Sequence, residues 1–160
     1  MRLLIAAVGR LKQGPERELF AHYIARAEAA GRKLGLTPLA VVEIAEAKAS
    51  AAKARAETEA QALLAKVPAS HKIVCLDPGG DQLDSEEFAK AIAKLRDGGA
   101  QGLAFLVGGA DGLGLTASFK ADKMLSLGRM TLPHGLARIV LAEQIYRAVT
   151  ILAGHPYHRA

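Results

Sequence analysis

Short apolar runs recur along the chain, and each is followed by residues that are typical of turns. Uninterrupted apolar runs of this length are typical of strands buried on both faces, as in a parallel sheet. Glycine, proline and aspartate separate these runs from the segments that follow them. The pattern predicts five strands, over residues 2–8, 39–44, 72–76, 103–107 and 124–127.

The segments between these strands have the composition of helices. Pro15 suits the first turn of a helix that ends at Gly31. Residues 45–66 are rich in alanine, lysine and glutamate but poor in large apolar side chains. Alanine at this density favours helix, so we expect a peripheral, solvent-facing helix there rather than a disordered linker. A further short helix is expected around residues 116–121.

The clearest signal for a helix start follows the third predicted strand. The segment 77–81, Asp-Pro-Gly-Gly-Asp, is predicted to be a loop. Asp84 or Ser85 then caps a helix, and Glu87 is placed to complete a capping box. The glycine pair at 98–99 ends this helix.

The last predicted helix, residues 133–153, is apolar on more than one face. A helix of this kind needs two packing partners, and one of them is expected to be the sheet. The other is either a neighbouring helix or a second subunit. We expect the second subunit, because so small a domain has few helices to spare. The two apolar stripes consist of Leu136, Ile139, Ala142, Tyr146 and Val149, and of Leu141, Ile145, Ala148 and Leu152.

Strands that alternate with helices predict a single α/β domain, with a parallel sheet flanked by helices on both faces. A chain of 160 residues suits one core, and we find no internal repeat or domain boundary. The single cysteine, Cys75, is expected to be an inert buried strand residue in a reduced, cytoplasmic protein. The apolar run at 2–8 is too short for a signal peptide, and no membrane span is expected.

Positive charge is concentrated in the last third of the chain. The formal net charge is +5, and residues 113–160 contain six basic residues against two acidic ones, with three histidines besides. Such a local field favours a polyanionic partner such as nucleic acid. The alternative is ordinary solvated surface, and charge alone does not separate the two.

Three glycine-containing loops follow predicted strands, at residues 77–81, 108–114 and 128–133. Ligands of open α/β sheets bind at the carboxyl ends of the strands, where these loops lie. The Gly-x-Gly-x-x-Gly spacing of dinucleotide-binding turns is absent, and so is the Gly-Lys-Ser/Thr of phosphate-binding loops. A nucleotide site and a plain strand-to-helix turn are therefore equal alternatives. His155 and His158 straddle a proline, which does not favour zinc, and we expect no metal site.

The chain ends on an unusual combination of side chains. Tyr157, His158 and Arg159 bring an aromatic ring, an imidazole and a guanidinium into consecutive positions. Together they can stack on a base, manage a proton and hold a phosphate. The alternative, a frayed terminus, is what composition alone favours.

Several motifs of the chain, taken in order, resemble those of one family. They closely resemble the ribosomal large subunit methyltransferase H family, small SPOUT-class enzymes that methylate N3 of a pseudouridine in 23S rRNA. The resemblance covers essentially the whole chain. The motifs are Leu106-Val107-Gly108-Gly109-Ala110-Asp111-Gly112, Leu125-Ser126-Leu127, Met130-Thr131-Leu132-Pro133-His134 with Arg138, Glu143-Gln144-x-Tyr146-Arg147-Ala148 and Pro156-Tyr157-His158-Arg159.

This resemblance implies a trefoil-knotted fold, in which the last strand, its loop and the last helix thread back through the chain. It also implies a homodimer packed through the knot and S-adenosylmethionine as the methyl donor. The implied partner is 23S rRNA within the assembled ribosome, with no membrane partner. By position, the resemblance assigns cofactor contacts, mostly through the backbone, to Leu76, Gly108, Leu127, Gly128, Arg129, Met130, Thr131 and Leu132.

Methyl transfer to N3 requires that the pseudouridine imide lose its proton. His158 is the most suitable base, because an imidazole titrates nearest to neutral pH, and Glu143 is a second candidate. Arg147 and Arg159 supply positive charge that favours the imide anion, and Tyr157 lies with them against the RNA. The alternative for Glu143 and Arg147, four residues apart, is a simple surface ion pair.

A rival hypothesis comes from another class of protein. It is a non-catalytic nucleotide- or RNA-binding module of flavodoxin-like architecture, with the same glycine turn and basic C-terminus. Such a module would bind ribosomes without binding S-adenosylmethionine, and this difference separates the two hypotheses.

Overall fold

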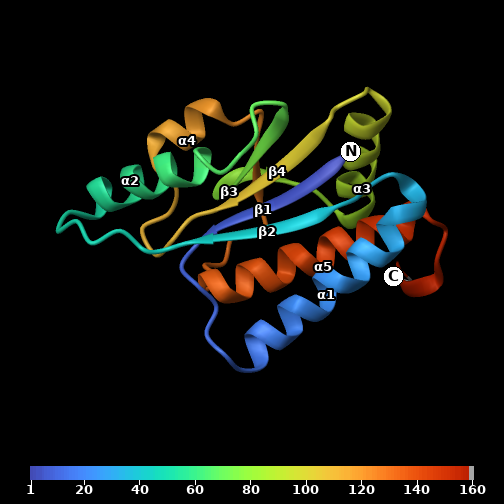
Figure 1. Ribbon diagram of the computed structural model, residues 1–160, viewed down its shortest axis with the longest axis horizontal. Coiled ribbons are helices and arrows are strands. Elements are labelled where there is room, and N and C mark those ends of the chain that lie inside the picture. Colours follow the sequence, from blue (N-terminus) through green and yellow to red (C-terminus); the bar gives the residue numbers. More distant parts are fainter. Residues whose placement is uncertain (159–160) are drawn as a thin grey trace.

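Five parallel strands form one sheet, in the order β2-β1-β4-β3-β5. The computed structural model describes residues 1–158 (Figure 1). A helix lies between each two consecutive strands and carries the chain back, as expected for parallel pairing. The strands are β1 (Arg2–Val8), β2 (Leu39–Ile44), β3 (His71–Gln82), β4 (Gly102–Val107) and β5 (Lys123–Ser126).

Helices cover both faces of the sheet. The helices α1, α3 and α5 pack into one hydrophobic core, and α2 and α4 pack into a second core on the opposite face. Figure 1 shows α1 and α5 side by side across one face, with α2 and α4 on the other. The α/β prediction is therefore confirmed. The helices are α1 (Pro15–Gly31), α2 (Ala52–Leu64), α3 (Ser85–Asp97), α4 (Leu115–Lys120) and α5 (His134–Leu152), with short 3-10 turns η1 (Arg32–Leu34) and η2 (Pro156–His158).

Local signals for the start of α3 are confirmed in detail. The Asp84 side chain accepts a hydrogen bond from the Glu87 amide, and the Glu87 side chain accepts one from the Asp84 amide. This reciprocal pair satisfies two amides that the first helical turn leaves without partners. The helix ends at the glycine pair 98–99, as predicted.

The prediction of a helix over residues 45–66 is only partly correct. Helix α2 begins at Ala52, and the preceding residues 45–51 are irregular. Side chains of α2 bind the backbone of that segment: Arg55 donates to two of its carbonyl groups, and Glu59 accepts from the Ala47 amide. These contacts compete with helical hydrogen bonds. The helix is also less peripheral than expected, because Ala60 and Leu63 are buried in the second core.

The prediction that the third strand ends at residue 76 is wrong. Leu76 and Asp81 both pair with Leu125 of β5, so the intervening residues bulge out and β3 then resumes pairing. Gly80 permits this bulge, since a Cβ atom there would lie 2.7 Å from the Leu125 amide nitrogen. Only glycine tolerates so close an approach of two backbones.

The second apolar stripe of α5 does not need a second subunit for its burial. Leu141, Ile145 and Ala148 are buried within the chain, where α5 packs between α1 and α3. The expectation based on that stripe is therefore wrong, since neighbouring helices fill the role. Only Leu136 and Val140 of α5 remain among the exposed large apolar residues of the described chain. Over residues 1–158, we find no helix with the length and apolar character needed to cross a membrane.

Candidate functional site

The carboxyl ends of β4, β3 and β5 lie side by side, and predicted cofactor residues follow each of them. Cys75 pairs with Leu106, and Leu76 pairs with Leu125. Gly108 follows β4 at this edge, and Leu127 follows β5. The register therefore brings the starts of three predicted ligand-contacting segments together at the sheet edge where α/β proteins bind ligands.

The loop between β5 and α5 has backbone groups that are free to bind a ligand. Gly128 has φ of 127°, a conformation that favours glycine, and its amide donates to the Ser126 hydroxyl at 3.1 Å. From Arg129 to Leu132, no backbone hydrogen bond occurs within the described part of the chain. The Met130 side chain is 82% exposed. A loop of this kind suits a ligand that is gripped through backbone amides and carbonyls.

A hollow of about 370 Å³ opens beside this loop. One wall is the end of β5 with Leu127 and Gly128, and the facing walls come from the start of α3 and the middle of α5. Its size falls in the range of small-molecule sites. The residues that line it are Gln82, Leu83, Asp84, Ser85, Phe88, Leu125, Ser126, Leu127, Gly128, Val140, Leu141 and Gln144.

A larger hollow of about 520 Å³ adjoins the first, shares Leu83, Phe88 and Leu125 with it, and extends between α3 and the starts of β3 and β5. Lys72 and Lys123, which line it, lie at the starts of β3 and β5, so this hollow extends toward the amino ends of the strands. Its described lining includes none of the predicted site residues. We therefore place the candidate site at the smaller hollow and the loops beside it.

The glycine turn after β4 is closed and fastened to α2. Gly109 and Gly112 form a bridge across the turn, and a Cβ atom on Gly108 would lie 2.6 Å from the Gly112 backbone. Asp111 forms an ion pair of 2.8 Å with Arg55 of α2. The hydrogen bond from Arg55 lowers the pKa of Asp111 below its usual value. Asp111 therefore serves to anchor the turn.

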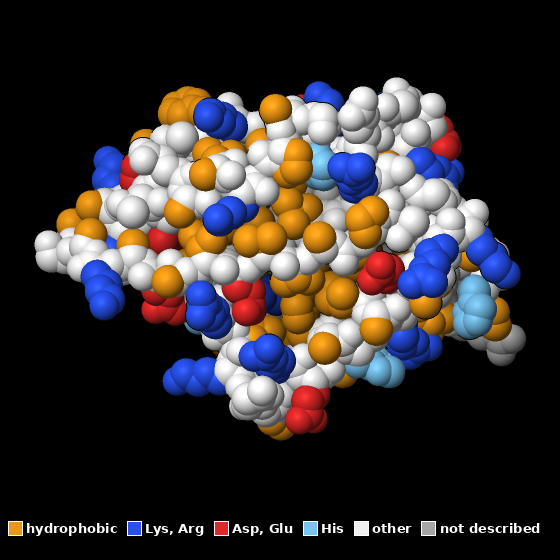
Figure 2. Space-filling view, in the orientation of Figure 1, with side chains coloured by type: hydrophobic (Ala, Val, Ile, Leu, Met, Phe, Trp, Pro, Cys, Tyr) orange, Lys and Arg blue, Asp and Glu red, His pale blue; other side chains and the backbone are white. Residues whose placement is uncertain are grey.

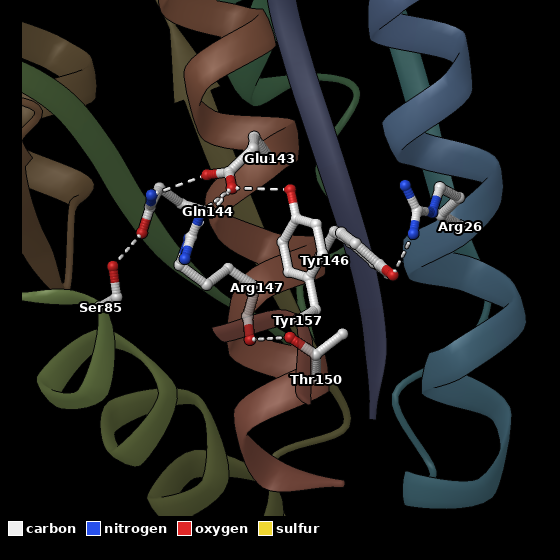
Figure 3. Close-up of polar contacts among 8 residues, drawn as sticks. All are labelled: Arg26, Ser85, Glu143, Gln144, Tyr146, Arg147, Thr150 and Tyr157. Carbon is white, nitrogen blue, oxygen red and sulfur yellow. Dashed lines mark hydrogen bonds and ion pairs between the residues drawn. The ribbon is translucent and has the colours of Figure 1, made fainter. Parts of the chain in front are cut away.

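The C-terminal turn packs back on α5 rather than fraying. The Tyr157 hydroxyl donates to a carboxylate oxygen of Glu143 at 3.1 Å, and the Tyr157 ring lies 4.6 Å from the Tyr146 ring (Figure 3). Arg147 donates two hydrogen bonds to the same Glu143 oxygen, at 2.6 and 3.0 Å. The structure thus brings together Glu143, Arg147 and Tyr157, which we call the tail cluster.

The protonation states within the tail cluster follow from its contacts. Burial, a hydrogen bond with Tyr23 and the Glu143 charge raise the pKa of Tyr157. The hydrogen bond with Glu143 also raises the pKa of Arg147. Tyr157 is therefore a neutral hydrogen-bond donor at physiological pH, and Arg147 is a fixed cation.

Sequence reasoning missed two side chains that support the tail cluster. The second Glu143 oxygen accepts a hydrogen bond of 2.7 Å from Gln144, whose own amide oxygen accepts one of 2.7 Å from Ser85. This chain of contacts links the tail cluster to the hollow, because Ser85 and Gln144 line it. Ser85 lies 59 positions from Gln144, and no local pattern predicts a contact over that separation.

Arg26 of α1 is a third residue that sequence reasoning missed. Its guanidinium donates to the Tyr146 hydroxyl at 2.7 Å. The same guanidinium lies over the rings of Tyr146 and Tyr157, at 4.4 and 5.4 Å from their centroids. The nearby Tyr23 ring completes the aromatic group, 6.3 Å from the Tyr146 ring.

Arg138 is fully buried at the start of α5 and ties together three segments. Its guanidinium donates to Glu43 at 2.8 Å and to the Val8 carbonyl at the end of β1. The Leu11 amide donates to the same Glu43 oxygen at 3.0 Å. Burial lowers the pKa of Arg138, and the Glu43 carboxylate opposes that effect. Arg138 therefore holds the end of the β5–α5 loop in place from within the core.

The predicted cofactor loops and the predicted C-terminal site residues lie in different parts of the molecule. The loops are at the carboxyl edge of the sheet, whereas the C-terminal turn lies beside α1 and α5 near the N-terminal end of β1 (Figure 1). Within the described chain, no hydrogen bond joins the tail cluster to Leu76, Gly108 or the 127–132 loop. The His158 side chain and Arg159 lie outside the described residues, so their predicted roles remain predictions.

No group of three or more histidine, cysteine, aspartate or glutamate side chains that could hold a metal ion occurs within residues 1–158. The buried Cys75 thiol is close to the Ala117 carbonyl, and burial raises its pKa to about 11. A thiol in that state is a poor nucleophile. The described residues around the site offer guanidinium, carboxylate, hydroxyl, amide and backbone groups.

Comparison with known proteins points to one family over the full length. The family described as "Predicted SPOUT methyltransferase" matches residues 1–158. Two relatives named "Ribosomal RNA large subunit methyltransferase H", from Xanthobacter autotrophicus and Rhodopseudomonas palustris, are 55% and 53% identical over 160 residues. Each alignment covers 100% of both chains. A relative of the same name from a Methylobacterium species is 48% identical over 159 residues, which cover 99% of this chain and 98% of the relative.

Proposed function

The chain belongs to the SPOUT methyltransferase family, and we propose that it methylates N3 of a pseudouridine in 23S rRNA with S-adenosylmethionine as donor. The observation that carries this proposal is the similarity, over the full length, to relatives named as rRNA large subunit methyltransferases.

The β5–α5 loop and the ends of β3 and β4 fit the methyl donor. S-adenosylmethionine supplies a methyl group on a positively charged sulfur when it is bound. The free backbone groups from Arg129 to Leu132 would bind the polar edges of its adenine, and Leu76 and Leu127 would contact its apolar faces. Gly108 admits close approach of the backbone at the facing loop. These residues orient the donor, and orientation is the main requirement of a displacement reaction.

The tail residues would prepare the nucleophile. We assign His158 as the base that takes the N3 proton, because Glu143 is already occupied by three hydrogen-bond donors on one oxygen and a fourth on the other. Glu143 instead orients Arg147 and Tyr157. Arg147 and Arg159 place positive charge near the imide and favour its anion. Replacing His158 with alanine is expected to leave cofactor affinity near normal while methyl transfer falls.

A homodimer would bring the two groups of residues together. In one chain, Glu143 lies nine residues along α5 from His134, about 14 Å at 1.5 Å per residue. The tail cluster of one subunit would complete the cofactor site of its partner. In this dimer the two subunits would pack through the trefoil knot that we propose for the segment from β5 through α5. Support for the knot comes from membership of the SPOUT family.

The substrate would be the assembled ribosome within the cytoplasm. Residues 1–158 form one α/β unit, with no separate RNA-binding domain among them. The specificity of the reaction would therefore come from recognition of the shape of the folded ribosomal RNA. Methylation of assembled ribosomes that far exceeds methylation of a bare transcript is the expected result.

Mapping the modified nucleotide tests the proposal. Methylation of N3 blocks the pairing edge of the base, so primer extension on 23S rRNA should stop there only when the active protein has been present. Mass spectrometry of the same RNA should show one added methyl group on a pseudouridine. Calorimetry with S-adenosylmethionine gives the second measurement. A protein that binds ribosomes but neither binds the donor nor modifies the RNA would instead support the non-catalytic module.

A further inference from the structure

Arg26 of α1 stands beside the tail cluster as a cation without a carboxylate partner in residues 1–158. Figure 3 shows it reaching from α1 toward Tyr146, whose hydroxyl accepts a hydrogen bond from its Nη2 at 2.7 Å. Its Nη1 lies 3.4 Å from Nε2 of His22, one turn earlier on the same helix. These neighbours position the guanidinium, and none of them cancels its charge.

Aromatic rings hold Arg26 in place. The guanidinium carbon lies 4.4 Å from the Tyr146 ring centroid and 5.4 Å from the Tyr157 ring centroid. Arg147 approaches the Tyr157 ring at 5.1 Å and is paired with Glu143. Guanidinium groups stacked on rings keep their hydrogen-bonding edges available. Two arginines therefore flank Tyr157, and within residues 1–158 only Arg147 has an anionic partner.

The surroundings of Arg26 favour an anion. Its side chain is exposed, and Figure 2 shows Lys, Arg and His side chains at the same end of the molecule, where α1 and the C-terminal turn lie. An exposed guanidinium that is already immobilised loses little entropy when it binds a phosphate through two parallel hydrogen bonds. The exposed Arg26 guanidinium is therefore suited to bind a phosphate group of a polyanion.

We propose that Arg26 contacts an rRNA backbone phosphate beside the tail cluster, with Tyr146 holding its guanidinium in position. The proposal rests on the proposed function, in which the tail of the chain meets the RNA. A contact of this kind fixes the position of the RNA and contributes affinity, but it does not read the sequence. Arg26 would thus extend the RNA-binding surface from α5 and the tail onto α1.

Salt-dependent binding tests this contact. The wild-type protein, Arg26→Ala and Arg26→Lys would be titrated against purified large ribosomal subunits at several KCl concentrations, without S-adenosylmethionine. We expect Arg26→Ala to bind about tenfold more weakly and to lower the slope of log affinity against log salt by about 1. Arg26→Lys should retain most of the slope. Lys53→Ala, which removes the same charge from α2 on the opposite face, should leave the slope unchanged.

The Tyr146→Phe variant separates the positioning of the Arg26 guanidinium by Tyr146 from the phosphate contact that Arg26 itself makes. It keeps the Arg26 charge and the ring but removes the hydroxyl that accepts its hydrogen bond. Affinity should fall by a smaller factor, with the salt slope unchanged. If a folded Arg26→Ala protein keeps wild-type affinity and salt slope, the proposal is overturned and Arg26 only supports Tyr146. A wild-type protein that does not bind large subunits would overturn the proposal as well. Binding that depends on Arg26 without any methylation would instead overturn the proposed function and leave this contact standing.

Discussion

The Tyr157 hydroxyl donates a hydrogen bond of 3.1 Å to Glu143, which lies 14 positions earlier in the chain. This contact, together with the tilted packing of the Tyr157 ring against the Tyr146 ring, holds the C-terminal turn on α5. Residues near a chain end are mobile unless such contacts fix them. The position of the C-terminal turn η2 therefore depends on the Tyr157–Glu143 pair.

Tyr157→Phe is expected to lower methyl transfer by about tenfold, because a hydrogen bond to a charged group contributes about 1.5–3 kcal/mol. The ring should stay on Tyr146, so the melting temperature should fall by only a few degrees. A tritium methyl-transfer assay on ribosomes, with thermal unfolding beside it, measures both quantities. Tyr157→Ala, which removes the ring as well, is the control and should be more severely impaired. Full activity in the phenylalanine variant would contradict the role given to the hydroxyl.

Gln144→Ala removes the donor to the second oxygen of Glu143 and separates the tail cluster from Ser85. Glu143 then retains Arg147 and Tyr157, so we expect a several-fold fall in kcat with little change in KM for the donor. Gln144→Glu places a second carboxylate beside Glu143 and should impair the reaction further through repulsion. Steady-state kinetics at several pH values measures the effect.

Ser85→Ala is the matched variant at the other end of this chain of contacts. It should have a smaller effect than Gln144→Ala, because Gln144 keeps its bond to Glu143. A larger effect of Ser85→Ala would mean that Ser85 acts through the hollow instead of through Glu143.

The strands could be predicted from the sequence because burial on both faces leaves a continuous apolar run. Strands β1 and β4 at the centre of the sheet are buried almost throughout, and the patterns over 2–8 and 103–107 match them closely. The capping of α3 was predictable for the same reason, since all its partners lie within a few residues. Where the determinants are local, the sequence pattern is sufficient.

Features set by distant contacts could not be predicted in this way. The segment 45–51 is irregular because Arg55 and Glu59 bind its backbone. The partners of α5 depend on which helices lie beside it. Arg26 and Tyr146 are 120 positions apart, and nothing in either neighbourhood signals their contact. The cofactor loops were placed through resemblance to a family, and the structure adds only that their starts are adjacent.

Stability at low pH is expected to depend on the ion pair between Asp111 and Arg55. Because the folded state lowers the pKa of Asp111, this carboxylate contributes stability at pH values above its unfolded pKa. The contribution is lost as the pH falls through the lower, folded pKa. Thermal unfolding from pH 7 to pH 2 should therefore show a steeper acid decline for the wild-type protein than for Asp111→Asn. Asp81→Asn, at a more exposed ion pair with Lys123, is the control and should follow the wild type.

Arg138→Met is expected to destabilise the protein strongly. The side chain of Arg138 is 0% exposed, and its removal leaves the Glu43 carboxylate and the Val8 carbonyl without their buried donor. Loss of one partner of a buried ion pair costs about 3–5 kcal/mol. Urea unfolding measures the change in the free energy of unfolding. Adding Glu43→Gln to the same chain should restore part of the loss, and Arg55→Met at the exposed pair should have a much smaller effect.

The donor loops and the tail cluster lie apart in one chain. We therefore predict that two inactive variants, one damaged in the loops and the other in the tail, restore activity when they form a mixed dimer. Gly128→Ala should weaken donor binding, because φ of 127° suits glycine alone. Tyr157→Ala should impair the tail while leaving the donor loops intact. If each active site combines the loops of one subunit with the tail of its partner, each homodimer is inactive. A mixed dimer then has one site with both intact parts.

Unfolding and refolding an equal mixture of the two variants tests this arrangement. Random pairing gives about half mixed dimers, so roughly a quarter of wild-type activity should appear on assembled ribosomes. The chain carrying both substitutions, mixed with wild-type protein, is the control, since any mixed dimer then has each site damaged in one part. Absence of recovered activity in a mixture that forms dimers would show that each subunit uses its own tail. Recovery would place the tail cluster of one subunit against the donor loops of the other.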